Sequence, residues 1–270
     1  MSAMNEKKIH IYGRGKLGSA LSSRALDAGV DSLLLSGRGA TPPSRHAHLI
    51  ILAIPDGAVE ETMRALDAGY DEDVAFVHVA GTLPSRMPLP SGRPTGGMHP
   101  LISFASNEHL ARLSGRTFTL RGDAQAIERA RDFVLDVGGI PLVHELSGPA
   151  YHASAALLAN GAVALADRAA SILDSLGVES AARNLALAGL LESVADNLRE
   201  LGPSGALTGP IARGDVSTVE AHRLALSESL RRDYDSIGSL ILSTALKTGL
   251  DEKAVRAISD ALAQPLNPED

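Results

Sequence analysis

A glycine-rich segment near the start of the chain points most directly to chemistry. It reads G-x-G-x-x-G over residues 13–18 and lies between an apolar run and an amphipathic stretch. Between a strand and a helix, the first glycine permits a tight turn, the second lets the backbone approach a pyrophosphate, and the third lets helix and strand pack closely. The alternative is a turn with only a structural role. We predict that a dinucleotide is bound by Gly13, Arg14, Gly15, Lys16, Leu17 and Gly18.

The end of the second expected strand indicates which dinucleotide is bound. NAD-specific sites carry an acidic residue there, about 20 residues after the glycines, to bond the ribose 2′-hydroxyl. Here the strand ends Leu35-Ser36-Gly37-Arg38, and the nearest acid, Asp31, precedes the strand. A hydroxyl and a guanidinium suit a 2′-phosphate. Ser36 and Arg38 therefore predict NADP, with NADPH favoured over NADH, although a solvated Arg38 is the alternative.

Two further strand ends supply candidate cofactor contacts. The third strand ends at residues 53–56 and the fourth at residues 79–82. Ligands of open α/β sheets bind at the carboxyl ends of the strands. We therefore predict cofactor contacts from Ile54, Pro55, Asp56 and Gly81, with room for a nicotinamide beside Gly81. Asp56 could equally be the N-cap of the next helix.

Histidine is the best candidate to move a proton near neutral pH. His99 falls in the Pro- and Gly-rich stretch 82–100, which we expect to be an ordered loop. His152 and Asn160 share an Ala-rich helix, roughly 80° apart around its axis. We predict that all three are catalytic. The alternatives are that His99 bonds loop backbone, and that the helical pair is bonded in a core or across a dimer interface.

The stretch 201–215 contains several glycines and two prolines and is expected to be a loop between helices. Arg213 is predicted to hold a substrate carboxylate by paired donors, with Thr208 beside it. The following residues, Ser217 to Glu220, match a capping box and need no chemical role.

Composition excludes several functions. Among 270 residues, 25 are basic and 32 acidic, for a formal net charge of −7. That charge attracts neither nucleic acid nor anionic membranes, and we expect neither as a partner. Cysteine is absent and nine histidines form no H-E-x-x-H pattern, so no metal site is expected. The first eight residues are polar, and no apolar run approaches the ~20 residues of a membrane span, which predicts a cytoplasmic protein.

The elements that must position these residues change in character along the chain. Strands are expected at 9–12, 32–35, 48–54, 74–79, 116–120 and 140–143, with helices at 16–28, 57–68 and 124–137. This alternation predicts an α/β fold, with a Rossmann NADP-binding domain of mainly parallel sheet at residues 1–146.

The remainder of the chain, residues 147–270, is predicted to be an all-helical domain for substrate binding and dimerisation. Helices are expected at 149–175, 180–199, 216–230, 234–248 and 251–263. The Ala-rich helix 151–173 has too few polar residues for one exposed side. We expect it to be buried centrally or in a homodimer interface.

A set of motifs runs along nearly the whole chain: the glycine loop, Ile54-Pro55-Asp56, residues 98–104 (MHPLISF), 151–156 (YHASAA), Asn160 and 207–215 (LTGPIARGD). In these motifs the chain resembles bacterial Rossmann-like proteins that contain the domain of unknown function 2520. Those proteins are relatives of pyrroline-5-carboxylate reductase, ketopantoate reductase and the 6-phosphogluconate dehydrogenase group.

The resemblance implies an NADPH-dependent oxidoreductase that reduces a carbonyl or imine of a small metabolite, in a cleft between the two domains. Related hydroxyacid dehydrogenases place a catalytic lysine four residues before the asparagine that Asn160 matches. This chain has Ala156 there, so the lysine mechanism does not transfer. The alternative is a non-catalytic NADP-binding sensor or assembly protein on the same fold. A third hypothesis adds a deazaflavin as the redox partner of NADP.

Overall fold

The computed structural model describes residues 8–104 and 113–264. The polar start expected at residues 1–7 lies outside the described residues. The chain divides into two compact units, Met1–Ala159 and Asn160–Asp270. The boundary predicted at 146/147 lies next to the start of the long helix α4, Gly148–Ser175, and stays a prediction.

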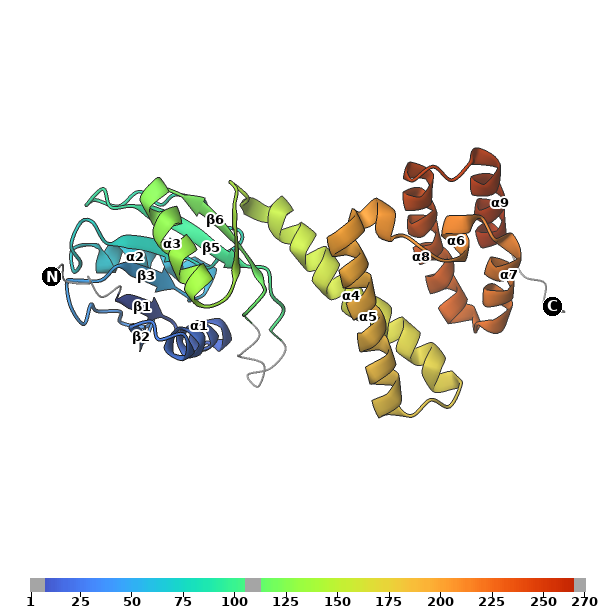
Figure 1. Cartoon of the computed structure of the whole chain (residues 1–270), viewed down its shortest axis with the longest axis horizontal. Helices are drawn as coiled ribbons and strands as arrows, with labels where there is room; N and C mark the ends of the chain where they lie inside the picture. Colours follow the sequence, from blue (N-terminus) through green and yellow to red (C-terminus); the bar gives the residue numbers. More distant parts are fainter. Residues whose placement is uncertain (1–7, 105–112, 265–270) are drawn as a thin grey trace. The chain divides into compact units, whose positions relative to one another are not determined.

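The first unit is built on a seven-stranded sheet in the order β2-β1-β3-β4-β5-β6-β7 (Figure 1). Every neighbouring pair is parallel except β5 and β6, which are antiparallel. This arrangement, followed by a helical C-terminal region, confirms the α/β Rossmann-type fold. The strands are β1 (Ile9–Tyr12), β2 (Ser32–Leu35), β3 (Leu49–Leu52), β4 (Ala75–His78), β5 (Thr95–Pro100), β6 (Thr117–Gly122) and β7 (Ile140–Val143).

Strand β5 corrects the expectation that residues 82–100 form a loop throughout. Its sequence, TGGMHP, has low strand propensity because it contains two glycines and a proline. The glycines are needed for the pairing with β6. A Cβ atom at Gly97 would lie 2.7 Å from Cζ of Arg121, and one at Gly96 would lie 2.6 Å from the Arg121 carbonyl oxygen. His99 therefore lies on a strand and not in a loop.

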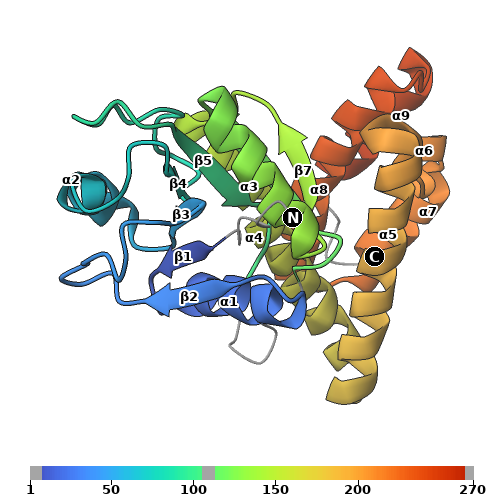
Figure 2. The ribbon, with the colours of Figure 1, turned by 60° about the vertical axis from the view of Figure 1, so that its left-hand side comes forward.

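Helices cover both faces of the sheet. On one face, α1 (Lys16–Asp27) and α3 (Ala124–Asp136) enclose an apolar core with alternate residues of the strands. On the opposite face, the 3₁₀ helix η1 (Asp56–Ala58) leads into α2 (Val59–Asp67), which closes a second core (Figure 2). These four segments agree closely with the predicted helices.

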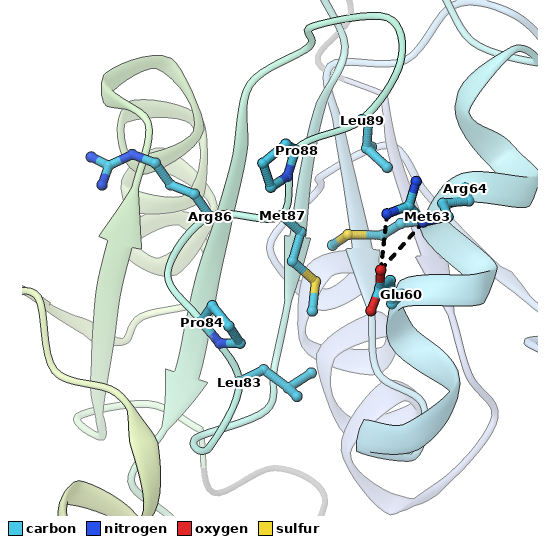
Figure 3. Close-up of a pocket in the computed structure, with 9 residues that line it drawn as sticks. All are labelled: Glu60, Met63, Arg64, Leu83, Pro84, Arg86, Met87, Pro88 and Leu89. Atoms are coloured by element: carbon cyan, nitrogen blue, oxygen red, sulfur yellow. Dashed lines mark hydrogen bonds and ion pairs between the residues drawn. The ribbon is translucent and has the colours of Figure 1, made fainter.

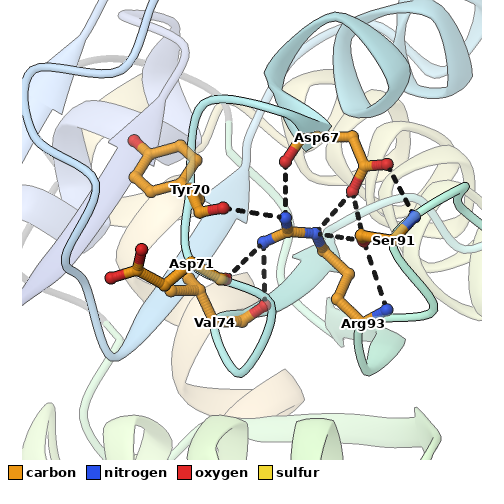
Figure 4. Close-up of polar contacts among 6 residues, drawn as sticks. All are labelled: Asp67, Tyr70, Asp71, Val74, Ser91 and Arg93. Carbon is orange, nitrogen blue, oxygen red and sulfur yellow. Dashed lines mark hydrogen bonds and ion pairs between the residues drawn. The ribbon is translucent and has the colours of Figure 1, made fainter.

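A buried arginine fixes the segment between β4 and β5. The Arg93 side chain is fully enclosed, and its Nε donates to the Asp67 carboxylate at 2.6 Å and to Ser91 Oγ at 3.0 Å (Figure 4). Its remaining donors bond backbone carbonyls, including those of Tyr70 and Val74. The charge is therefore neutralised and hydrogen-bonded, as a buried cation requires.

The second unit is helical, as predicted, with different boundaries. Helices α6 to α9 enclose an apolar core of their own. The stretch 201–215, expected to be a loop, is mostly helical, because α5 continues to Ala206 through a break at Gly202 and α6 follows. The helices are α5 (Ser180–Ala206), α6 (Pro210–Arg213), α7 (Val216–Ala225), α8 (Glu228–Lys247) and α9 (Glu252–Ala263).

The start of α7 corrects a predicted cap. Because the helix begins at Val216, its N-cap is Asp215 and not Ser217. The Asp215 carboxylate accepts from the Thr218 amide at 3.1 Å and from the Ser217 hydroxyl at 2.9 Å. The capping box predicted from Ser217 to Glu220 is therefore wrong.

None of the described residues of α4 is buried within the structure. The expected burial of the Ala-rich helix, centrally or in a homodimer interface, stays a prediction. The apolar length of α4 corrects another expectation. An 18-residue window within it has a mean hydropathy of 1.3, which by length and composition alone is enough to cross a membrane. This is weak evidence for a span, since helices of soluble proteins pass the same test.

Candidate functional site

The glycine loop has the steric properties that its motif predicts. Gly13 has a φ of +122°, which disfavours any other residue. A Cβ atom at Gly13 would overlap the carbonyl oxygen of Ala53, and one at Gly18 would overlap the carbonyl oxygen of Gly13. In contrast, a Cβ atom at Gly15 would meet no atom within 4 Å. Gly13 and Gly18 serve tight packing, whereas the space beside Gly15 is open.

The helix that follows offers its first amides to an anion. Gly15 is the N-cap of α1, and no side chain caps the helix. The Ser19 amide bonds the Gly15 carbonyl at 3.0 Å, and the amides before it precede the first i to i−4 bond of the helix. An uncapped N-terminus beside an open space suits a pyrophosphate.

Three strand ends converge on this loop. The Gly13 amide donates to the Leu35 carbonyl at 3.0 Å. A Cβ atom at Gly37 would lie 2.5 Å from Cγ2 of Ile54 and 3.9 Å from Cα of Gly13. The ends of β1, β2 and β3 therefore pack on one another at the carboxyl edge of the sheet, where a dinucleotide would lie.

Ser36 and Arg38 form a small exposed turn at the end of β2. The Ser36 hydroxyl donates to the Arg38 carbonyl at 3.1 Å and accepts from the Arg38 amide at 3.2 Å. Within the described residues, no acidic side chain pairs with the Arg38 guanidinium, which lies exposed. The turn therefore presents a cation next to the glycine loop.

Asp56 does not cap a helix. It is the first residue of η1, whose N-cap position is Pro55, and no side chain caps that helix. The Asp56 carboxylate instead accepts a hydrogen bond from the Thr82 hydroxyl at 2.7 Å. This bond joins the segment after β3 to the segment after β4.

A hydrogen-bonded cluster lies at the end of β5. Nδ1 of His99 lies 2.8 Å from the Tyr151 hydroxyl, and that hydroxyl lies 2.8 Å from Oγ1 of Thr119. Thr119 comes from β6, directly opposite His99 in the register, and Tyr151 comes from the first turn of α4. The His99 ring therefore bonds the Tyr151 side chain, and Thr119 donates to the His99 carbonyl at 3.3 Å. The alternative, that the ring bonds loop backbone, is not what orients it.

The imidazole of His152 lies next to this cluster and close to Gly81. The rings of His99 and His152 lie 6.1 Å apart in an edge arrangement. A Cβ atom at Gly81 would lie 3.0 Å from Nε2 of His99 and 3.2 Å from Nδ1 of His152. Gly81 thus lies beside both imidazoles, and only a residue without a side chain fits there unless they move.

The guanidinium of Arg121 places a positive charge close to the His99 cluster. Its side chain is 1% exposed and crosses the face of Gly97, and its Nη2 donates to the Ala80 carbonyl at 2.6 Å. Among the described residues, Nε and Nη1 have no hydrogen-bond partner. Burial, followed by the charges of Arg121 and His152, lowers the pKa of His99 to about 4. His99 is therefore neutral at pH 7.

His78 belongs to the same buried layer. It is fully enclosed, and its Nε2 lies 3.0 Å from the Pro84 carbonyl. Burial lowers its pKa to about 4, and Arg121 lowers it further against the opposing effect of the Pro84 bond. The layer therefore holds one permanent cation and two neutral histidines.

One known family model matches part of the chain. Residues 116–241 match the sequence model described as "Domain of unknown function (DUF2520)". The resemblance found in the sequence is confirmed over this segment, which includes Thr119, Arg121, Tyr151 and His152. No curated protein matches the chain.

Solved structures share the fold over most of the chain. The Thermotoga maritima protein TM1727 is 24% identical with a TM-score of 0.63, covering 88% of this chain and 99% of its own. A putative NADP oxidoreductase, BF3122 of Bacteroides fragilis, is 18% identical with a TM-score of 0.62 over 90% and 98%. A 1-pyrroline-5-carboxylate reductase of Streptococcus pyogenes is 20% identical with a TM-score of 0.53 over 90% and 98%. At these identities the likeness shows the fold alone.

Three of the predicted catalytic residues lie in the second unit. Asn160 is exposed on α4, Thr208 is exposed before α6, and Arg213 is exposed at the end of α6. Arg213 and Thr208 flank the short helix, with a left-handed Gly214 after it. Their role stays a prediction.

Three site residues were missed in the sequence: Thr119, Arg121 and Tyr151. On β6, Thr119 and Arg121 alternate with the buried Phe118 and Leu120, so a strand period of two could have placed both on the face of His99. Tyr151 precedes His152 in the resembling stretch. Its contact with His99 joins residues 52 positions apart and depends on tertiary packing.

A pocket elsewhere in the first unit involves none of the predicted residues. It measures about 270 Å³ and lies between α2 and the segment 83–89 (Figure 3). Apolar side chains such as Met63 and Met87 form its wall, while Arg64 is paired with Glu60 at 2.9 Å. Within residues 8–104 and 113–264, no three His, Asp or Glu side chains lie close enough to hold a metal ion.

Proposed function

We propose that this protein is an oxidoreductase that uses NADPH to reduce a C=N or C=O group of a small metabolite. The observation that supports this most directly is the pairing of an open space at Gly15 with an uncapped α1, at the edge where three strands end. The Bacteroides fragilis neighbour is itself described as a putative NADP oxidoreductase, which agrees with the proposal.

The residues fit the cofactor. The first turn of α1 would hold the pyrophosphate, and Ile54 and Pro55 would line the groove beside the glycine loop. Ser36 and Arg38 would hold the 2′-phosphate, since no acid replaces them at the end of β2. When bound, NADPH supplies a hydride.

The residues at the ends of β4 and β5 would face the reacting group. Gly81 leaves space beside His99 and His152, and Asp56 is tied to Thr82 at the same edge. We propose His99 and His152 as catalytic residues. The proposal that Asn160, Thr208 and Arg213 of the helical domain also bind the substrate rests on the sequence.

The experiment titrates the purified protein with NADPH and NADH and then follows NADPH oxidation with cyclic imines, keto acids and aldehydes. We expect NADPH to bind at least about tenfold more tightly than NADH, a difference of about 1.4 kcal/mol. Arg38→Ala should remove this difference, whereas Arg45→Ala, an exposed arginine paired with Asp71, should keep it. Equal binding of both cofactors to the unaltered protein would refute the NADP preference.

A second candidate function is a non-catalytic NADP sensor. Ala156 favours it, because related dehydrogenases have their catalytic lysine at that position. Tight NADPH binding with no turnover of any substrate in the panel would favour the sensor. Turnover that is lost in His152→Ala would favour the enzyme.

We also propose that the protein is a homodimer through the helical domain. The helices α4 and α5 span 28 and 27 residues, and neither has a buried residue. Within the second unit, Val163, Leu185 and Leu190 are 68%, 77% and 64% exposed. So much apolar surface on two long helices is typical of a face covered by a second copy.

A further inference from the structure

Three contacts join the members of the cluster at His99, and they determine where its hydrogen atoms lie. Oγ1 of Thr119 lies 3.3 Å from the His99 carbonyl and 2.8 Å from the Tyr151 hydroxyl, which lies 2.8 Å from Nδ1 of His99. Only one arrangement of hydrogens makes all three of them hydrogen bonds.

The arrangement follows from counting donors. A carbonyl oxygen only accepts, so the single hydrogen of Thr119 points to the His99 carbonyl. Tyr151 must then donate to Thr119, since Thr119 has no second hydrogen. The Tyr151 hydrogen is thereby used, so Nδ1 of His99 must bear a hydrogen and donate to Tyr151. A neutral imidazole has one N–H, and its Nε2 is therefore a bare acceptor.

Nε2 faces the space beside Gly81. A Cβ atom there would lie 3.0 Å from Nε2, and among the described residues no hydrogen bond to Nε2 is formed. The charged and titratable groups around the ring are Arg121, His152, His78 and Asp56. Burial disfavours a charge on the His99 ring most, and the buried cation of Arg121 disfavours it further. The acceptor state is the resting state at pH 7.

We propose that Thr119 and Tyr151 are positioning residues that hold His99 as its Nδ1–H tautomer, so that Nε2 accepts a hydrogen bond from the N–H of a protonated imine substrate. This rests on the proposed function and narrows its substrate class. Hydride from the reduced nicotinamide adds to the imine carbon, the C=N π pair moves onto nitrogen, and the amine forms without a proton from the protein. A carbonyl would give an alkoxide that needs a proton, which a bare Nε2 does not supply.

The chain contains its own control in the core of the first unit. Nδ1 of His10 lies 2.7 Å from the Tyr70 hydroxyl, which lies 2.7 Å from the Tyr12 hydroxyl, and Tyr12 donates to the Thr41 carbonyl at 3.1 Å. The same counting makes His10 an Nδ1–H tautomer. This second relay is independent of Thr119.

The test records ¹H–¹⁵N correlation spectra of the ¹⁵N-histidine-labelled full chain at pH 7. His99 is assigned by the loss of its signals in His99→Gln. We expect His99 in the unaltered protein to show a protonated Nδ1 and an unprotonated Nε2. In Thr119→Val, which keeps the side-chain shape, Tyr151 loses its acceptor and should donate to Nδ1, so the tautomer switches to Nε2–H. His10 should not change.

The second variant is Tyr151→Phe, at a residue that is only partly buried. In this variant His99 should also be mainly the Nε2–H tautomer, and the tautomer of His10 should not change. Both variants should raise the KM for the cyclic imine about tenfold, the equivalent of one hydrogen bond, and leave NADPH binding unchanged. A hydrogen on Nε2 of His99 in the unaltered protein would overturn the inference. Failure of NADPH to bind would overturn the proposed function and the substrate class, while the spectra would still decide the tautomer.

Discussion

A Cβ atom at Gly18 would overlap the carbonyl oxygen of Gly13, so the third glycine of the loop is held against the first by backbone alone. Gly18→Ala should therefore lower the free energy of unfolding by more than about 2 kcal/mol, because a backbone atom has to move. Gly189→Ala in α5, where a Cβ atom meets nothing within 4 Å, should stabilise the protein by about 0.5 to 1 kcal/mol. Urea unfolding measures both, and equal stability of the two variants would contradict the packing described.

The buried Arg93 gives a second stability prediction. Its ion pair with Asp67 is enclosed, with Arg93 0% and Asp67 7% exposed. Arg93→Ala leaves that carboxylate unpaired and should cost about 3 to 5 kcal/mol. Arg64→Ala, which breaks the exposed pair with Glu60, should cost about 0.3 to 0.5 kcal/mol. A loss below about 1 kcal/mol for Arg93→Ala would show that the segment 67–93 is fixed by other contacts.

Acid should destabilise the fold through His78. Because burial lowers its pKa from 6.5 to about 4, the unfolded chain binds a proton more readily than the folded one in this interval. The free energy of unfolding should thus fall as pH decreases from about 6.5 to 4, by about 2 to 4 kcal/mol for this buried group. His99 should add to the fall in the same direction.

His78→Gln removes one titrating group and keeps a donor for the Pro84 carbonyl. Its stability should depend less on pH over the same interval, as measured by urea unfolding at several pH values. His222→Gln, which replaces an exposed histidine bonded to Tyr234, should leave the dependence unchanged. An identical pH slope in His78→Gln and the unaltered protein would contradict the assignment.

Local pattern was enough to predict most of the fold. The glycine loop, three helices of the first unit and six strands follow from short-range periodicity and turn residues. Strand β5 could not be predicted, because Gly96 and Gly97 have low strand propensity. Glycine is needed at both positions because Arg121 of β6 leaves no room for a Cβ atom. Likewise the boundaries of α5 and α6 depend on how the chain turns at Gly202 and Gly209.

The site was predictable only in part. The sequence indicated His99, His152 and Gly81 separately, and the structure brings these three together. It did not indicate that Tyr151 and Thr119 bond His99, since such contacts arise only once the strands and α4 are packed. The roles of Asn160, Thr208 and Arg213 stay predictions for the same reason.

The proposed homodimer predicts the effect of charge on α5. Leu185→Glu places a carboxylate on the apolar face of α5 and should convert a dimer into a monomer, as light scattering would show. Leu240→Glu, at a residue 72% exposed on α8, should leave the dimer intact. A monomeric unaltered protein would contradict the proposal. If that monomer also sedimented together with lipid vesicles, the apolar surface of α4 would be assigned to contact with a membrane.

The most direct test of the central claim is NADPH binding to a Gly15→Asp variant. Gly15 has the extended conformation of an N-cap, with φ −75° and ψ −178°, and aspartate is a preferred N-cap residue. The variant should therefore keep or raise the stability of the fold, while its carboxylate fills the open space and repels the pyrophosphate. We predict at least about a hundredfold weaker NADPH binding, about 2.7 kcal/mol. A stably folded Gly15→Asp protein that binds NADPH as tightly as the unaltered protein would contradict the account.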